Sequence, residues 1–216
     1  MTQTNISLNA FVYIIESPGD FDLLNGQIEG QALTNSLNLC RIRSTYSLVC
    51  NRRTFLEAIT NRLINARNHY DCPPILHFSM HGAEGGIGLT DGDFISWDEL
   101  RELLTQLNTR LGFLPLICFS SCYGINSWTM EYNNQAISSF AAILGHSGEL
   151  FWSNSAVAYI TFYNRLFYGS PIEQAVEAMK AAIGDNNFYY FPAENIKNLY
   201  ALDSLKQELM DNSVLL

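Results

Sequence analysis

The chain has 216 residues, of which 48% are hydrophobic and 15% are charged, so it can bury a substantial core and is not expected to be disordered. Twelve basic residues against 21 acidic ones give a net charge of −9, and no basic cluster offers a track for phosphates, which argues against a nucleic-acid partner. No uncharged apolar run approaches the roughly 20 residues that a bilayer span needs, so no membrane association is expected.

The cysteine content favours a reducing compartment. The five cysteines are odd in number and lack Cys-x-x-Cys spacing, which argues against a disulfide framework or a zinc knuckle. The first ten residues are polar and do not resemble a signal peptide. We therefore expect a cytoplasmic protein with reduced thiols. No domain linker stands out, and residues 1–216 are expected to form a single domain.

The first third of the chain alternates between β-rich runs and helical patterns. Residues 11–15 and 41–49 are predicted strands, and the apolar spacing over residues 24–37 predicts a helix between them. Thr54 and Glu57 fit a capping box, which predicts that the next helix begins there.

The middle of the chain continues this alternation. Residues 75–80 form an apolar run that predicts a buried strand, and the glycine-rich stretch 82–92 predicts a hairpin. Ser96 and Glu99 fit a second capping box at the start of a helix. Residues 114–121 then predict another buried strand.

The last third is expected to add a helix at 136–144, a short strand at 149–152, and further helices over 156–168, 170–183 and 195–210. Alternating strands and helices predict an α/β fold, a three-layer α/β/α sandwich with a mostly parallel central sheet.

Two of the predicted strands end in residues that carry chemistry. One ends at His81-Gly82 and the other at Cys122. Parallel sheets bring such strand ends together at one edge, where a thiol and an imidazole can perform acyl transfer. Gly82 lets the backbone approach a substrate closely, and the amides of Gly82 and Cys122 can point at a developing oxyanion.

Other interpretations of these residues stay open. Cysteine is often buried, so Cys122 taken alone is more typical of a core position, and the matching place of His81-Gly82 is what favours the catalytic interpretation. His77 shares a strand face with His81, and the pair could hold a metal, but no carboxylate set completes such a site and a core histidine is favoured. Cys118 precedes Cys122 by the same spacing, and we predict that it packs in the core.

The two strand ends, His-Phe-Ser-Met-His81-Gly82 and Ile-Cys-Phe-Ser-Ser-Cys122-Tyr-Gly, resemble the caspase-like cysteine peptidases, a group that includes caspases, metacaspases, gingipains, separase and the bacterial CHAT-type proteases. The order of the two motifs, their separation of 41 positions and the glycine-rich hairpin carry the resemblance. Residues 159–169 also resemble the CHAT pattern.

The resemblance implies a thiol endopeptidase. Cys122 would attack the peptide carbonyl, His81 would act as acid and base, and the amides of Gly82 and Cys122 would form the oxyanion hole. Trp152, Ser153 and Asn154 would line the substrate cleft. Members of this group that cut after basic residues carry an aspartate just after this tryptophan, and the chain has no aspartate there. Cleavage after a small or neutral residue therefore stays an open alternative.

The resemblance further implies a protein or peptide substrate, no cofactor, no metal, and an activating or regulatory protein partner, as in a bacterial signalling or defence system. Two alternatives stay open. The chain could be a catalytically silent interaction module of the same fold, or a hydrolase of small esters or amides.

Overall fold

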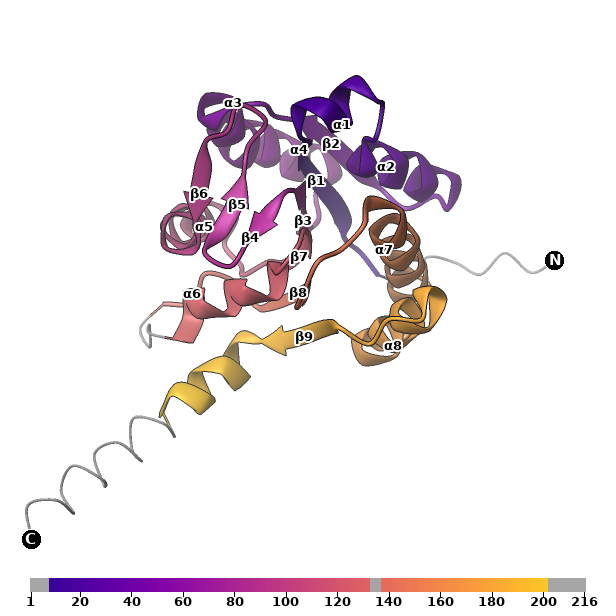
Figure 1. Cartoon of the computed structure of the whole chain (residues 1–216). Coiled ribbons are helices and arrows are strands. Elements are labelled where there is room, and N and C mark those ends of the chain that lie inside the picture. The colour runs from indigo at the N-terminus through magenta and orange to yellow at the C-terminus, as the bar shows by residue number, and fades with distance from the viewer. Residues whose placement is uncertain (1–7, 133–136, 202–216) are drawn as a thin grey trace, which may run out of the picture.

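A six-stranded sheet forms the centre of the protein, in a computed structural model that describes residues 8–132 and 137–201 (Figure 1). Its strand order is β2-β1-β3-β7-β8-β9, and all neighbours are parallel except β8 and β9. The strands are β1 (Phe11–Ser17), β2 (Ser44–Leu48), β3 (Pro74–Met80), β7 (Leu116–Ser120), β8 (Ala142–His146) and β9 (Phe188–Pro192).

Helices cover both faces of this sheet, as predicted for an α/β/α sandwich. One face packs against α2 (Glu29–Leu39), α7 (Trp152–Phe167) and α8 (Ile172–Ile183). The other packs against α3 (Arg52–Glu57), α4 (Leu63–Tyr70) and α5 (Trp97–Leu111), with the short α6 (Thr129–Tyr132) near its edge. Because both faces are covered, β1 and β3 are buried at every position and appear in the sequence as continuous apolar runs.

The face of the sheet under α2 and α7 changes from apolar to polar toward the carboxyl ends of the strands. One row across this face holds His77 and Cys118 between aliphatic residues, and the next row holds Glu16, Ser79 and Ser120 in register. One residue position separates this polar row from the loops at the carboxyl edge of the sheet. The polar row therefore lies directly beneath the edge where sites form in parallel sheets.

A small antiparallel sheet follows β3 and confirms the predicted hairpin. Its strands are β4 (Gly82–Ala83), β5 (Gly86–Gly88) and β6 (Phe94–Ser96). Arg52 at the start of α3 anchors it through Asp93, at 2.9 Å, and through Glu99. The indole of Trp97 donates to the carbonyl of Glu84 at 2.8 Å, which fixes the tip of the hairpin.

The helix starts differ from the predictions at two places and agree with them at a third. Residues 24–37 do not form one helix, because α1 (Asp20–Leu24) and α2 are separate. The predicted capping box at Thr54 is wrong: Asn51 caps α3 and accepts from the Thr54 amide at 2.9 Å. Ser96 caps α5 as predicted, accepting from the amide of Glu99 at 3.2 Å.

The segment before α7 also differs from the prediction. Residues 142–144, predicted as helix, belong to strand β8, and residues 149–151 are not a strand. Gly145 lets the strand approach the 3₁₀ helix η2 (Gly124–Trp128): a Cβ there would lie 2.6 Å from the Ile125 nitrogen. Residues 133–136 lie outside the described part of the chain. Of the predicted 195–210 helix, the described residues are helical to 201.

Candidate active site

The two residues singled out by the sequence follow neighbouring parallel strands. His81 comes directly after β3 and Cys122 two residues after β7, and these strands pair in register. Both residues line one cavity of about 360 Å³ at the carboxyl edge of the sheet. Its lining consists of Met80, His81, Gly82, Ser121, Cys122, Tyr123, Glu149, Leu150, Phe151 and Trp152.

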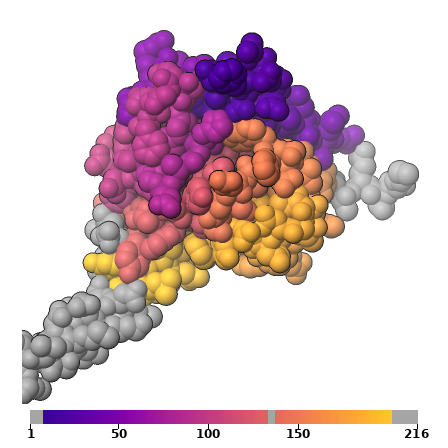
Figure 2. Space-filling view, viewed as in Figure 1, coloured from indigo at the N-terminus to yellow at the C-terminus, as the bar shows by residue number. Residues whose placement is uncertain are grey.

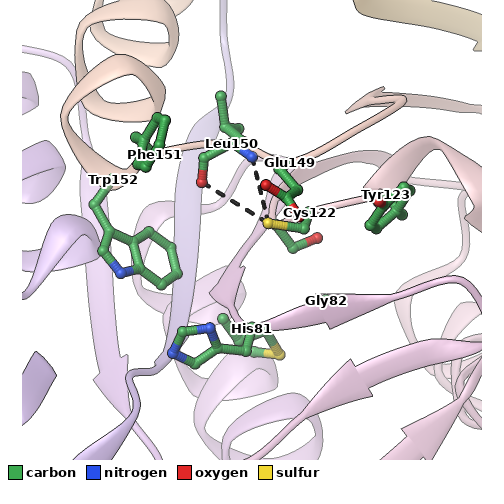
Figure 3. A pocket seen from close by; sticks show the side chains of 10 residues that line it. His81, Gly82, Cys122, Tyr123, Glu149, Leu150, Phe151 and Trp152 are labelled. Carbon is green, nitrogen blue, oxygen red and sulfur yellow. Dashed lines mark hydrogen bonds between the residues drawn. The ribbon is translucent and has the colours of Figure 1, made fainter. Parts of the chain in front are cut away.

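The cavity opens where segments distant in the sequence meet. The magenta hairpin region, the salmon segment after β7 and the orange start of α7 come together on one face of the molecule (Figure 2). Within the cavity, the imidazole of His81 lies across from the sulfur of Cys122, and the indole of Trp152 stands beside them (Figure 3). This arrangement leaves space between a thiol and an imidazole.

The imidazole of His81 is held by a carboxylate that the sequence analysis did not find. Its Nε2 lies 2.8 Å from Oδ2 of Asp22 on α1, and its ring centroid lies 5.4 Å from that of Trp152, edge to face. The His81 side chain is 56% exposed, whereas that of Asp22 is 17% exposed. Because Asp22 occupies Nε2, Nδ1 is the ring nitrogen left for the cavity.

Asp22 sits on a loop and short helix that are fixed by buried polar contacts. Below this segment, Glu16 accepts from the amides of Gly30 at 2.8 Å and Gln31 at 3.1 Å, and from the hydroxyl of Tyr46 at 2.7 Å. Burial raises the pKa of Glu16 above its ordinary value, and these hydrogen bonds work in the opposite direction. The contacts tie the start of α2 to the end of β1, and so hold both ends of the segment that carries Asp22.

The sulfur of Cys122 is half-buried and contacts the backbone of the segment before α7. The amide of Leu150 donates to Sγ at 3.3 Å, and Sγ lies 3.9 Å from the Leu150 carbonyl oxygen. The chain reverses at Tyr123, which has a left-handed φ of 55°, and its amide donates to the carbonyl of Gly148 at 2.9 Å. The reversal brings the sulfur to the cavity wall.

Gly82 lies against the backbone of Cys122. The amide of Gly88 donates to the His81 carbonyl at 2.9 Å, so Gly82 and its partner Ile87 form a pair without ladder hydrogen bonds. The Gly82 amide therefore donates no ladder hydrogen bond to β5. A Cβ at this position would lie 2.1 Å from the carbonyl oxygen of Cys122, so only glycine fits.

Only one of the three residues expected to bind substrate lines the cavity. Trp152 lines the cavity, whereas Ser153 and Asn154 are exposed on the first turn of α7 and are not among the lining residues. A carboxylate lies just before Trp152 in the chain and not just after it: Glu149 lines the cavity.

His77 and Cys118 are core residues, as predicted. His77 is fully buried, and its Nδ1 lies 3.0 Å from the hydroxyl of Tyr163. Its contact is therefore with the core and not with a metal ion shared with His81. Burial raises the pKa of Cys118 to about 12. Within residues 8–132 and 137–201, no group of three or more His, Cys, Asp or Glu side chains is placed to hold a metal ion.

Comparison with solved structures supports the α/β fold. The chain is similar to a secreted C11 cysteine protease from Bacteroides thetaiotaomicron, iotapain, with a TM-score of 0.62 and 10% sequence identity, over 88% of this chain and 68% of that one. No protein-family model and no curated protein matches the chain. The chain therefore has the fold of a caspase-like cysteine peptidase. No helix in the described part of the chain is long and apolar enough to span a membrane.

Proposed function

We propose that the chain is a cysteine endopeptidase with Cys122 as nucleophile and His81 as acid and base. The observation that carries the proposal is the single cavity shared by the thiol and the imidazole, each at the end of one of two adjacent parallel strands. A non-catalytic module of the same fold has no need of an open cavity between these two side chains.

The chemistry follows from the positions of the groups. His81 takes the proton of the Cys122 thiol as Sγ attacks the carbonyl carbon, and the carbonyl oxygen takes up negative charge beside the amides of Gly82 and Cys122. His81 protonates the leaving amine as the carbon–nitrogen bond breaks, which leaves a thioester on the sulfur. His81 then takes a proton from water, whose oxygen attacks the thioester, and passes that proton to the departing sulfur, which releases the acid and returns the thiol.

Asp22 has a positioning role in this proposal. Its carboxylate, 2.8 Å from Nε2 of His81, orients the ring and stabilises the imidazolium that forms before the leaving amine is protonated. The ring nitrogen that exchanges protons with the substrate is then Nδ1.

The cavity suggests how a polypeptide is recognised. Trp152 and Phe151 offer apolar surface at one side, and Phe151 is 76% exposed. Glu149 adds a carboxylate to the lining, so a basic side chain next to the scissile bond meets an opposite charge. The peptide library should therefore contain both neutral and basic residues immediately before the scissile bond.

A diverse library of internally quenched peptides tests the proposal. We expect cleavage that is abolished in Cys122→Ala and reduced by about 10²-fold or more in His81→Ala, the range of general acid–base catalysis. Cys118→Ala is the matched control, because this second cysteine is buried in the core. Hydrolysis of small esters without any peptide cleavage would contradict the proposal and favour the alternative hydrolase.

A further inference from the structure

A second histidine–carboxylate pair lies on the far side of the nucleophile from His81. His146 is the last residue of β8, and its side chain is 3% exposed. Its Nε2 lies 3.1 Å from Oδ2 of Asp185, which follows α8.

Asp185 is itself held in place. Its Oδ1 accepts from the amide of Asn187 at 2.8 Å, and the Asn187 carbonyl accepts from the amide of Ser147 at 3.0 Å. The hydrogen bond from the Asn187 amide is the main cause that lowers the pKa of Asp185, with a smaller contribution from His146. The imidazole of His146 is thus fixed by a rigid, charged partner and by the ring of Phe188, 5.0 Å away.

The other ring nitrogen of His146 holds the loop that follows it. Nδ1 lies 3.1 Å from the amide nitrogen and 3.0 Å from the carbonyl oxygen of Gly148. The same Gly148 carbonyl accepts from the amide of Tyr123, the residue after the nucleophile. Two residues further on, the amide of Leu150 donates to Sγ of Cys122. Residues 147–151 belong to neither a helix nor a strand, so regular structure does not fix this amide.

We infer that His146 is a positioning residue for the nucleophile: supported by Asp185, it holds the Gly148–Leu150 backbone so that the Leu150 amide donates to the sulfur of Cys122. An N–H group that donates to sulfur stabilises the thiolate, the form that reacts. The inference deepens the proposed function and rests on it for its biological meaning, because the thiolate matters only if Cys122 is the nucleophile.

The rate of alkylation of Cys122 by iodoacetamide tests this inference. In that reaction the thiolate forms a carbon–sulfur bond and displaces iodide, so the rate reports the reactive thiolate without any peptide cleavage. The rate is measured on the full chain by peptide mapping, between pH 6 and pH 9. We expect His146→Ala to slow alkylation near neutral pH about tenfold, the effect of one hydrogen bond to a charged atom.

Three further variants separate positioning from a structural role. Asp185→Ala is expected to slow alkylation in the same direction by a smaller factor, because Asp185 acts through His146. His146→Asn, which keeps a polar group near the Nδ1 position, is expected to recover part of the rate. His69→Ala is the matched control, because His69 is exposed at the end of α4.

A folded His146→Ala or Asp185→Ala protein whose Cys122 alkylates within twofold of the parent rate would overturn the inference, even if its melting temperature falls. If His146→Ala does not fold, Asp185→Ala and His146→Asn decide the question in the same assay. A chain that shows the expected alkylation rates but cleaves no peptide refutes the proposed function instead, so the two failures are distinguishable.

Discussion

Gly82→Ala offers the most demanding test of the site geometry. The added Cβ would lie 2.1 Å from the carbonyl oxygen of Cys122 and 2.9 Å from Cβ of Ser121. Carbon and oxygen atoms in close contact ordinarily lie about 3.3 Å apart or more, so the loop after β3 or the loop after β7 must move by about 1 Å. The substitution therefore displaces the nucleophile relative to the imidazole without removing either.

A displacement of about 1 Å costs roughly 10²-fold in rate when it misaligns reacting groups. We therefore expect kcat/KM on the best library peptide to fall by about that factor, with a loss of about 1–3 kcal/mol in unfolding free energy from overpacking. Gly85→Ala is the matched control, because a Cβ there meets no heavy atom within 4 Å. A Gly82→Ala protein with parental kcat/KM would refute the close approach of the two loops.

Three further predictions concern charge and reactivity. Asp22→Asn should lower kcat/KM at least about tenfold, because the His81 imidazolium loses its ion pair. The melting temperature should stay near the parent value, because the pair is partly exposed. An unchanged kcat/KM would argue against the positioning role of Asp22. Cys118 should resist iodoacetamide at pH 8 in the native chain, since its pKa is about 12, and become labelled only in denaturant; rapid native labelling would show that the core is open. The hydrogen bond from Arg52 lowers the pKa of Asp93, so the stabilising effect of this bond is complete above the ordinary aspartate pKa and is lost as the pH falls through the lowered pKa of the folded state. The melting temperatures of the parent and of Asp93→Asn should therefore differ near pH 6 and converge once the pH falls below that lowered pKa.

The sequence was sufficient to predict the centre of the fold because the inner strands have a simple signature. β3 and β7 are buried on both faces, so each is a short apolar run, and each is followed within two residues by a side chain of distinctive chemistry. Their register then places His81 and Cys122 at the same edge. Local pattern and global topology agree here, which is why both strands and both site residues could be located.

The outer part of the sheet was harder to predict for a physical reason. β8 is only five residues long, and Gly145 within it weakens any strand signal. That glycine is required by the neighbouring 3₁₀ helix, a contact that no local pattern reveals. The aromatic run of β9, which pairs antiparallel to β8, was overlooked although its residues favour strands.

The partners of the site residues could not be predicted from spacing. Asp22 lies 59 positions before His81 on a five-residue helix, and Asp185 lies 39 positions after His146. The usable signal was topological: His81, His146 and Asp185 each follow or end an element near the carboxyl edge of the sheet, whereas Asp22 lies within α1. Such a signal selects candidates, but only the folded chain brings each carboxylate within hydrogen-bonding distance of its imidazole.

Covalent labelling with a peptidyl acyloxymethyl ketone tests the central claim most directly. The compound carries the best library sequence and is mapped by mass spectrometry on the native chain. We predict one adduct, on Cys122, which is lost in Cys122→Ala and strongly slowed in His81→Ala. Labelling of the half-buried Cys40 or Cys50 in place of Cys122, or labelling of Cys122 at the same rate without His81, would contradict the account.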